Sequence, residues 1–228
     1  HGCSVITCIT AQNSVEVKSV EAVEDNTLLS QLDALFSDFD IKALKTGMLL
    51  NERIIINTAA KLNNYRIARI IDPVMVSRTG SRLLEDSAIN AYKALLLPLA
   101  EIVTPNIFEA KLLTNLEINN KEDIEQAANN ILLLGAKAVL VKGGGLKEMK
   151  GKDFFLDING RREWFFNKVI NTNNNHGSGC TLSAAICAYR ALGLNLIDSI
   201  KKAKLFIEKS LENSYRIGSG PGPLGHYQ

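Results

Sequence analysis

Apolar runs rich in β-branched residues alternate with helical patterns along most of this 228-residue chain. The run AKAVLVKGGG, residues 136–145, has the length and composition of a buried strand, whereas residues 121–134, KEDIEQAANNILLL, repeat their apolar side chains at helical spacing. Strands that are separated by helices pair in parallel, and the helices then cover both faces of the sheet. The alternation therefore predicts an α/β protein with a mainly parallel sheet.

The first two predicted strands and a late hairpin differ from this pattern. Residues 3–10 form an apolar run typical of a buried strand, and residues 15–23 alternate as in a half-exposed strand. A hairpin over residues 153–166 contains Asn159-Gly160, a dipeptide typical of a type I′ turn. The other predicted strands cover residues 41–47, 66–74, 101–106 and 136–145, and the predicted helices cover residues 26–38, 51–64, 87–100, 107–114, 121–134, a segment that begins near Cys180, and 196–215.

Charge and cysteine content narrow the class of protein. The 26 Lys and Arg against 24 Asp and Glu give a net charge of +2, which favours neither nucleic acid nor an anionic membrane as a partner. No apolar run approaches the ~18 residues that a membrane span needs. The four cysteines, Cys3, Cys8, Cys180 and Cys187, form no C-x-x-C pair, which argues against a zinc site and indicates a reducing, cytoplasmic location. No repeat or linker divides the chain, so we expect one domain over residues 1–228.

Polar residues and glycines stand at the ends of the predicted strands. In α/β sheets, ligands bind beyond the carboxyl ends of the strands. We therefore expect functional residues at these positions, which are Gln12, Met48, Asp72, Asn106 with Glu109, Lys142-Gly143-Gly144, and the turn 177–180.

The turn at residues 177–180 introduces a helix rich in small residues. Gly177 and Gly179 flank Ser178, so the backbone can form a concave nest at the helix start. Unpaired N–H groups and the helix dipole attract an anion there, and phosphate is the obvious one. A plain tight turn is an equal alternative.

Within this turn, Cys180 indicates a function more specifically than the glycines do. A thiol at a helix N-terminus has a stabilised thiolate, which predicts a pKa below ~8.5 and a group able to take a proton from a substrate alcohol. A small buried residue is the alternative. His176 is interpreted as a loop residue rather than a base, and Cys3, Cys8 and Cys187 as core residues.

Three other positions carry two interpretations each. Glu109, three residues after Asn106 on a helix start, could hold Mg²⁺ or could only complement the helix dipole. The sequence Lys142-Gly143 could admit a nucleotide against the backbone or could only end a strand. The amide of Gln12 matches the donor and acceptor edge of an aminopyrimidine, but it also suits an ordinary polar strand end.

Several segments, taken in order, resemble one family over essentially the whole chain. They are GCSVITCITAQN, KTGML, DPVMVSRTGSRLL, VTPNIFEAKLLT, VLVKGG, NTNNNHGSGCTLSAAICAYRALG and the tail IGSGPGPLGH. Together they closely resemble the hydroxymethylpyrimidine/phosphomethylpyrimidine kinases of thiamin biosynthesis, in the ribokinase-like superfamily. This resemblance implies a three-layer α/β/α sandwich. It also implies ATP- and Mg²⁺-dependent phosphorylation of 4-amino-5-hydroxymethyl-2-methylpyrimidine, followed by a second phosphorylation to the diphosphate.

The resemblance also assigns roles to residues. Gln12, Met48 and Val74 would line the pyrimidine pocket. The turn from Gly177 through Ser178 and Gly179 to Cys180 would be the anion hole, with Cys180 as the base. Glu109 with Asn106 would act near Mg²⁺, and Asp72 would help to position phosphates or metal. Apart from the resemblance, we expect Lys142, Gly143 and Asn106 to bind ATP. A homodimer is usual in the family.

One segment of the family pattern precedes this chain. The family carries G-[ST]-D-x-S-G-G-A-G-I-Q-A-D before the first segment, where it supplies a central strand and a substrate-site aspartate. We expect either that the chain is truncated or that these residues are not represented in this sequence. A pyridoxal kinase of the same superfamily and a truncated, inactive ligand-binding domain are therefore the alternative functions.

Overall fold

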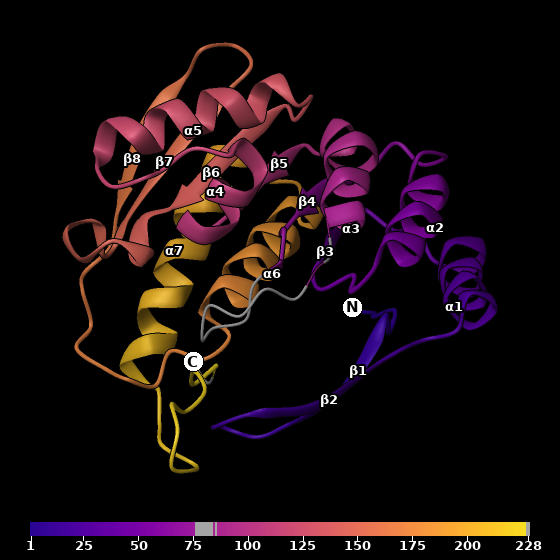
Figure 1. The fold of residues 1–228 in the computed structure, drawn as a ribbon, viewed down its shortest axis with the longest axis horizontal. Coiled ribbons are helices and arrows are strands. Elements are labelled where there is room, and N and C mark those ends of the chain that lie inside the picture. The colour runs from indigo at the N-terminus through magenta and orange to yellow at the C-terminus, as the bar shows by residue number, and fades with distance from the viewer. Residues whose placement is uncertain (76–83, 85, 227–228) are drawn as a thin grey trace.

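Helices cover both faces of a six-stranded sheet in the computed structural model, which describes residues 1–75, 84 and 86–226 (Figure 1). The strands lie in the order of the chain; the first three pairs of neighbouring strands are parallel and the last two pairs are antiparallel. The predicted fold class, an α/β sandwich with a mainly parallel sheet, is confirmed. The strands are β3 (Ala43–Thr46), β4 (Ala68–Ile71), β5 (Ile102–Val103), β6 (Ala138–Lys142), β7 (Lys152–Asp157) and β8 (Arg162–Phe166).

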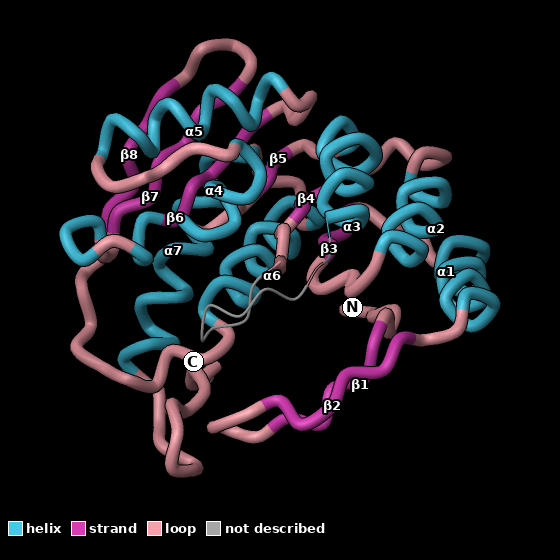
Figure 2. Tube along the Cα trace, in the orientation of Figure 1, coloured by secondary structure: helices cyan, strands magenta, loops and turns pink. Residues whose placement is uncertain are grey.

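Helices lie on either side of this sheet (Figure 2), and a separate hydrophobic cluster packs on each of its faces. Successive residues of a strand point to opposite faces, so Val139 and Val141 of β6 join one cluster and Leu140 joins the other. Five helices pack on the first face, and α6 (Ser178–Ala191) and α7 (Leu196–Glu212) pack on the second. The five are α1 (Asp25–Asp38), α2 (Glu52–Leu62), α3 (Asp86–Ala91), α4 (Ile107–Thr114) and α5 (Lys121–Leu133).

Asparagine side chains begin four of these helices. Each accepts a hydrogen bond from the backbone N–H three residues further on, which pairs one of the N–H groups that a helix start leaves free. These caps explain why the predicted helices begin where they do. They are Asn51, Asn106, Asn120 and Asn195.

The predicted helix over residues 87–100 is not regular throughout. After α3 the backbone widens into a π-helical turn over Tyr92–Leu96 and then tightens into a 3₁₀ turn over Leu97–Leu99. Pro98 lies in that last turn, where its missing N–H and its ring stop the α-helical pattern. No helix in the described part of the chain is long and apolar enough to cross a bilayer.

The predicted buried strand over residues 3–10 is wrong in burial and in extent. The structure has a two-stranded antiparallel ribbon, β1 (Cys8–Gln12) and β2 (Val17–Ala22), which we call the flap. It projects from the body of the molecule (Figure 1), and Ile9 is 64% exposed. Cys3 is exposed and Cys8 is only half-buried, so these two are not core residues, whereas half-buried Cys187 packs against the second hydrophobic cluster.

The turn of the late hairpin also differs from its prediction. A type I′ turn needs positive φ at both central residues, and here Gly160 has φ 81° while Asn159 does not have a positive φ. Asp157 and Arg161 close a three-residue loop instead, and the Asp157 carboxylate accepts the N–H groups of Asn159 and Arg161. The aspartate before the dipeptide therefore selects the turn.

Candidate active site

Asp72 lies at the carboxyl end of β4 and is 1% exposed. Its Oδ1 accepts hydrogen bonds from Thr104 Oγ1 and Lys142 Nζ, both at 3.1 Å, and its Oδ2 accepts one from Ser183 Oγ at 2.9 Å. Three elements, β5, β6 and α6, therefore converge on one carboxylate. Both of its oxygens have protein donors, so in this structure Asp72 positions Lys142 and α6.

Lys142 ends β6 and brings its ammonium under the glycine turn. A Cβ added to Gly179 would lie 3.2 Å from Lys142 Nζ, so the charge is close to the start of α6. Burial lowers the pKa of Lys142, but the carboxylates of Asp72 and Glu109 outweigh burial and raise the pKa above its usual range. Lys142 is therefore charged at neutral pH and faces the place where an anion would bind.

The turn itself has the geometry that anion binding needs. Gly177 has φ 84°, a left-handed conformation that favours glycine, and it precedes α6 without a side-chain cap. Within the described residues, the N–H groups of Gly179 and Cys180 have no acceptor in the protein. Free N–H groups and the Lys142 ammonium thus lie together at one helix start.

Cys180 is exposed at this turn, and its pKa moves opposite to the prediction. Desolvation by the surrounding protein and then the Asp72 carboxylate raise the pKa of the Cys180 thiol, although Lys45 and Lys142 act against them. The expectation of a lowered pKa is wrong because the helix start is not the only charge nearby. At neutral pH Cys180 is mainly a thiol.

Glu109 and Asn106 form a capping box at the start of α4. Asn106 Oδ1 accepts the Glu109 N–H at 2.9 Å, and Glu109 Oε2 accepts the Asn106 N–H at 2.7 Å. Glu109 is 3% exposed, and burial raises its pKa to about 7, with Lys142 acting in the opposite direction. The Glu109 carboxyl group therefore holds its proton to a higher pH than an ordinary glutamate does.

The residues present could hold Mg²⁺ only together with the phosphates of a bound nucleotide. Across the described part of the chain, no three His, Cys, Asp or Glu side chains cluster as a metal site. Mg²⁺ in kinases is commonly held by one or two carboxylates together with substrate phosphates and water. Glu109, which shares electrostatic contact with Asp72 and Lys142, is a carboxylate suited to that mode.

Lys45 is a site residue that the sequence analysis missed. It lies on β3, and a Cβ added to Gly47 would be 3.1 Å from its Nζ. It lowers the pKa of Cys180 more than Lys142 does, and it also lowers that of Cys187. A lysine beside the glycine at the end of a predicted strand is the signal that could have found it.

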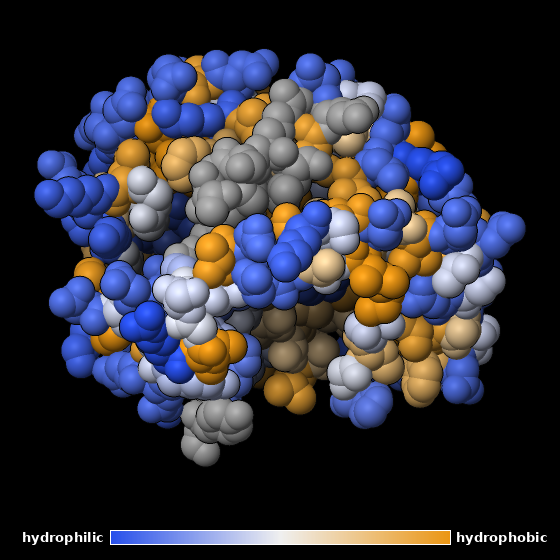
Figure 3. Space-filling view, turned by 60° about the horizontal axis from the view of Figure 1, so that its bottom comes forward, coloured by the Kyte–Doolittle hydropathy of each residue, from blue (hydrophilic) through white to orange (hydrophobic). Residues whose placement is uncertain are grey.

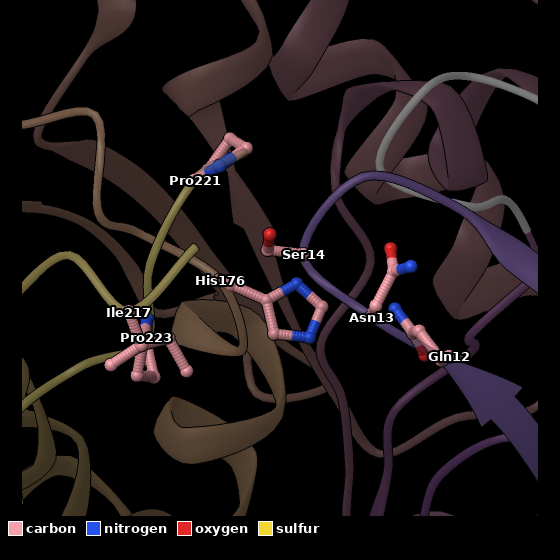
Figure 4. Close-up of a pocket in the computed structure, with 7 residues that line it drawn as sticks. All are labelled: Gln12, Asn13, Ser14, His176, Ile217, Pro221 and Pro223. Atoms are coloured by element: carbon pink, nitrogen blue, oxygen red, sulfur yellow. The ribbon is translucent and has the colours of Figure 1, made fainter. Parts of the chain in front are cut away.

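Gln12 lines a cavity of about 310 Å³ between the flap, the loop before α6 and the C-terminal segment (Figure 4). The side chains of Gln12, Asn13 and His176 border the same space in that view. His176 directly precedes the glycine turn, so the cavity adjoins the candidate anion site. The full lining is Gln12, Asn13, Ser14, His176, Ile217, Pro221 and Pro223.

Gln12 and Met48, which were both expected to line the pyrimidine pocket, do not lie together in this structure. Thr7 Oγ1 donates to the Met48 carbonyl at 2.7 Å, and Gln12 lies five residues further along the chain, about 16 Å at the rise of a strand. Met48 and Val74 follow β3 and β4, near Lys45 and Asp72.

Figure 3 shows the face that carries the flap, where apolar side chains are exposed among polar ones around a recess. The segment DPVMVSRTGSRLL lies partly outside the described residues.

The fold and the site define a phosphotransferase of the three-layer α/β class, because a lysine and a glycine turn meet at the carboxyl edge of the sheet. The chain belongs to the phosphomethylpyrimidine kinase family, whose model matches residues 1–225.

Several individual proteins are similar to this chain. A hydroxymethylpyrimidine/phosphomethylpyrimidine kinase of Synechococcus elongatus is 45% identical over all of this chain and 86% of its own length. The crystal structure of a phosphomethylpyrimidine kinase from Clostridium difficile has a TM-score of 0.80 and 36% identity over 91% of this chain and 85% of that one. A pyridoxal kinase of Bacillus subtilis in an ADP complex has a TM-score of 0.90 and 32% identity over 97% and 85%.

Proposed function

We propose that this protein uses ATP to phosphorylate the alcohol of 4-amino-5-hydroxymethyl-2-methylpyrimidine and then the resulting monophosphate, as in thiamin biosynthesis. One observation carries the proposal: the Lys142 ammonium, held by buried Asp72, lies beside free N–H groups at the Gly177–Cys180 turn. Phosphoryl transfer needs positioning and stabilisation of the charge on the transferred group more than covalent chemistry. This arrangement supplies both.

The N–H groups of Gly179 and Cys180 and the ammonium of Lys142 would stabilise the negative charge of the transferred phosphoryl group. In acyl-transfer enzymes, one such donor contributes about 3–4 kcal/mol to the transition state. Cys180 would accept the proton of the substrate alcohol as its oxygen attacks the γ-phosphate. Because the pKa of Cys180 is raised, the thiolate fraction and the rate should increase with pH across the neutral range.

Mg²⁺, when bound with ATP, would neutralise phosphate charge and orient the transferred group. Glu109, fixed by Asn106, is the carboxylate we assign to it, directly or through water. The role of Asp72 as a metal ligand stays a prediction, and its hydrogen bonds favour the positioning of Lys142. Gly143, directly after Lys142, would lie against the nucleotide.

Gln12 would bind the aminopyrimidine edge in the cavity beside His176, and Met48 and Val74 would contact the ring from the sheet side. Closure of the flap toward the sheet would bring the two groups together. A homodimer and a cytoplasmic location are further predictions.

Turnover on two alcohols tests the proposal. ATP consumption with the hydroxymethylpyrimidine should exceed consumption with pyridoxal, whose kinases include the structural neighbour of TM-score 0.90. Faster turnover of pyridoxal would replace the proposal by the alternative. Calorimetric binding of pyrimidine without ATP consumption would instead indicate an inactive ligand-binding domain.

A further inference from the structure

A buried ion pair joins α7 to β7 outside the groups used above. Lys204 of α7 and Asp153 of β7 form it, and these residues are only 5% and 9% exposed. Removing two charges from water costs free energy that their attraction only partly returns, so such a pair is weak evidence for a role in stability. The other contacts of this ion pair are therefore better evidence for its role.

The pair is connected to the turn that follows Lys142. Lys204 Nζ donates to Asp153 Oδ2, and Asp153 Oδ1 accepts the backbone N–H of Gly143 at 3.2 Å. One carboxylate thus bridges a buried ammonium and the first amide of the Gly143–Gly145 turn.

This turn is packed tightly on both sides. A Cβ added to Gly143 would lie 2.3 Å from the Lys152 carbonyl oxygen, so no side chain fits there. A Cβ added to Gly145 would lie 3.0 Å from Cβ of Ile107, the first residue of α4. A shift of the Gly143 amide would therefore move Lys142 on one side and the start of α4, with Glu109, on the other.

We propose that Lys204 is a positioning residue for the nucleotide: through Asp153 it fixes the Gly143 amide, and with it the spacing between Lys142 and the start of α4. This proposal rests on the nucleotide site proposed above. Without the ammonium, the Asp153 carboxylate would be buried without a counter-charge. The carboxylate would turn toward solvent to regain hydration, and the Gly143 N–H would lose its acceptor.

The position of Lys204 is itself fixed. Asn167 Nδ2 donates to the Lys204 carbonyl at 2.9 Å and also to Glu208 Oε2 at 3.0 Å, which attaches this part of α7 to the segment after β8. Lys201, one turn earlier on α7, offers a matched control. Its side chain is 53% exposed, and its Nζ lies 3.8 Å from Glu163.

The test compares Lys204→Met, Lys204→Arg and Lys201→Met in steady-state kinetics and in calorimetric binding of ADP. We expect Lys204→Met to raise the KM for ATP and the Kd for ADP about tenfold or more, while the KM for the pyrimidine alcohol changes less than about twofold. Lys204→Arg should restore most of the nucleotide affinity, and Lys201→Met should resemble the wild type. Unchanged nucleotide constants with only a lower kcat, or equal effects at positions 204 and 201, would overturn the proposal.

A double variant covers the case in which Lys204→Met does not fold. Lys204→Met with Asp153→Asn buries no charge and keeps an amide oxygen for the Gly143 N–H. We expect this variant to fold and to bind ADP within about threefold of the wild type. A folded double variant that has lost ADP binding would overturn the link through Gly143. Failure of the wild type to bind ADP would instead overturn the proposed function.

Discussion

Replacing Asp72 by Asn would test the arrangement on which the active site depends. The amide keeps the shape and can still accept from Thr104 or Lys142, but the carboxylate charge beside Lys142 is lost. The Lys142 side chain is 14% exposed, so its ammonium would be left largely buried beside Glu109 alone. Breaking a buried ion pair by removing one partner costs about 3–5 kcal/mol.

The expected effect on stability follows from this cost. In a protein of this size, 1 kcal/mol shifts the Tm by about 2–4 °C, so a loss of about 3 kcal/mol should lower the Tm by about 6–12 °C. The second effect is electrostatic. After desolvation, Asp72 is the largest cause that raises the pKa of Cys180, so Asp72→Asn should lower that pKa.

Thermal unfolding and alkylation of Cys180 by iodoacetamide across pH, followed by peptide mass spectrometry, measure the two effects. Ser183→Ala is the control, because it removes one hydrogen bond to Asp72 and no charge. It should lower stability by about 1–3 kcal/mol and leave the thiol titration in place. A Tm within about 2 °C of the wild type, together with an unmoved thiol titration, would refute the role of Asp72 as the partner of Lys142. A raised Mg²⁺ requirement alone would favour the metal role.

The other predictions concern the base, the metal and the substrate. Cys180→Ala should lower kcat by about 10²–10⁴, whereas Cys187→Ala should change kcat little; near-normal turnover of the first variant would remove the base. Glu109→Gln should raise the Mg²⁺ concentration at half-maximal activity. The pKa of Glu109 is about 7 in the folded protein, against an ordinary value of 4.5, so between these pH values the folded protein binds one proton that the unfolded chain has released. The free energy of unfolding should therefore fall by about 3 kcal/mol as pH rises from 4.5 to 7. Denaturant unfolding of Glu109→Gln should not show this fall. Gln12→Ala should weaken pyrimidine binding by about tenfold to a hundredfold in calorimetry and leave ATP binding unchanged, and equal weakening of both ligands would contradict the placement.

The parallel sheet and the positions of the helices could be predicted because both depend on the local periodicity of apolar residues. Burial of residues 3–10 was predicted wrongly, since apolar composition does not say whether a strand finds a partner layer. The hairpin turn was predicted wrongly for a related reason. Asn159-Gly160 favours one turn, but the Asp157 carboxylate accepts two backbone N–H groups and stabilises another.

At the site, the strand ends placed Asp72 and Lys142 at one edge of the sheet but did not indicate that they are in contact. The two residues are 70 positions apart in the chain, and no local pattern pairs them. Lys45 was missed because the glycine after its strand marks only the strand end, and its action on Cys180 of α6 arises from the tertiary structure. The raised pKa of Cys180 depends on desolvation by the surrounding protein and on Asp72, and both arise only from the tertiary structure.

The order of the strands also bears on how the molecule folds. β6, β7 and β8 follow one another through short connections and pair antiparallel, so their contacts are local in the chain. In contrast, α6 packs against β3 and β4, which lie more than a hundred residues earlier. Because closing long loops slows folding, we expect residues 138–166 to gain amide protection first in pulse-labelled hydrogen exchange. Lys142 belongs to this early unit, whereas Asp72 follows β4, which packs against α6 later. Their ion pair should therefore form last, and catalytic activity should appear only in the slowest folding phase.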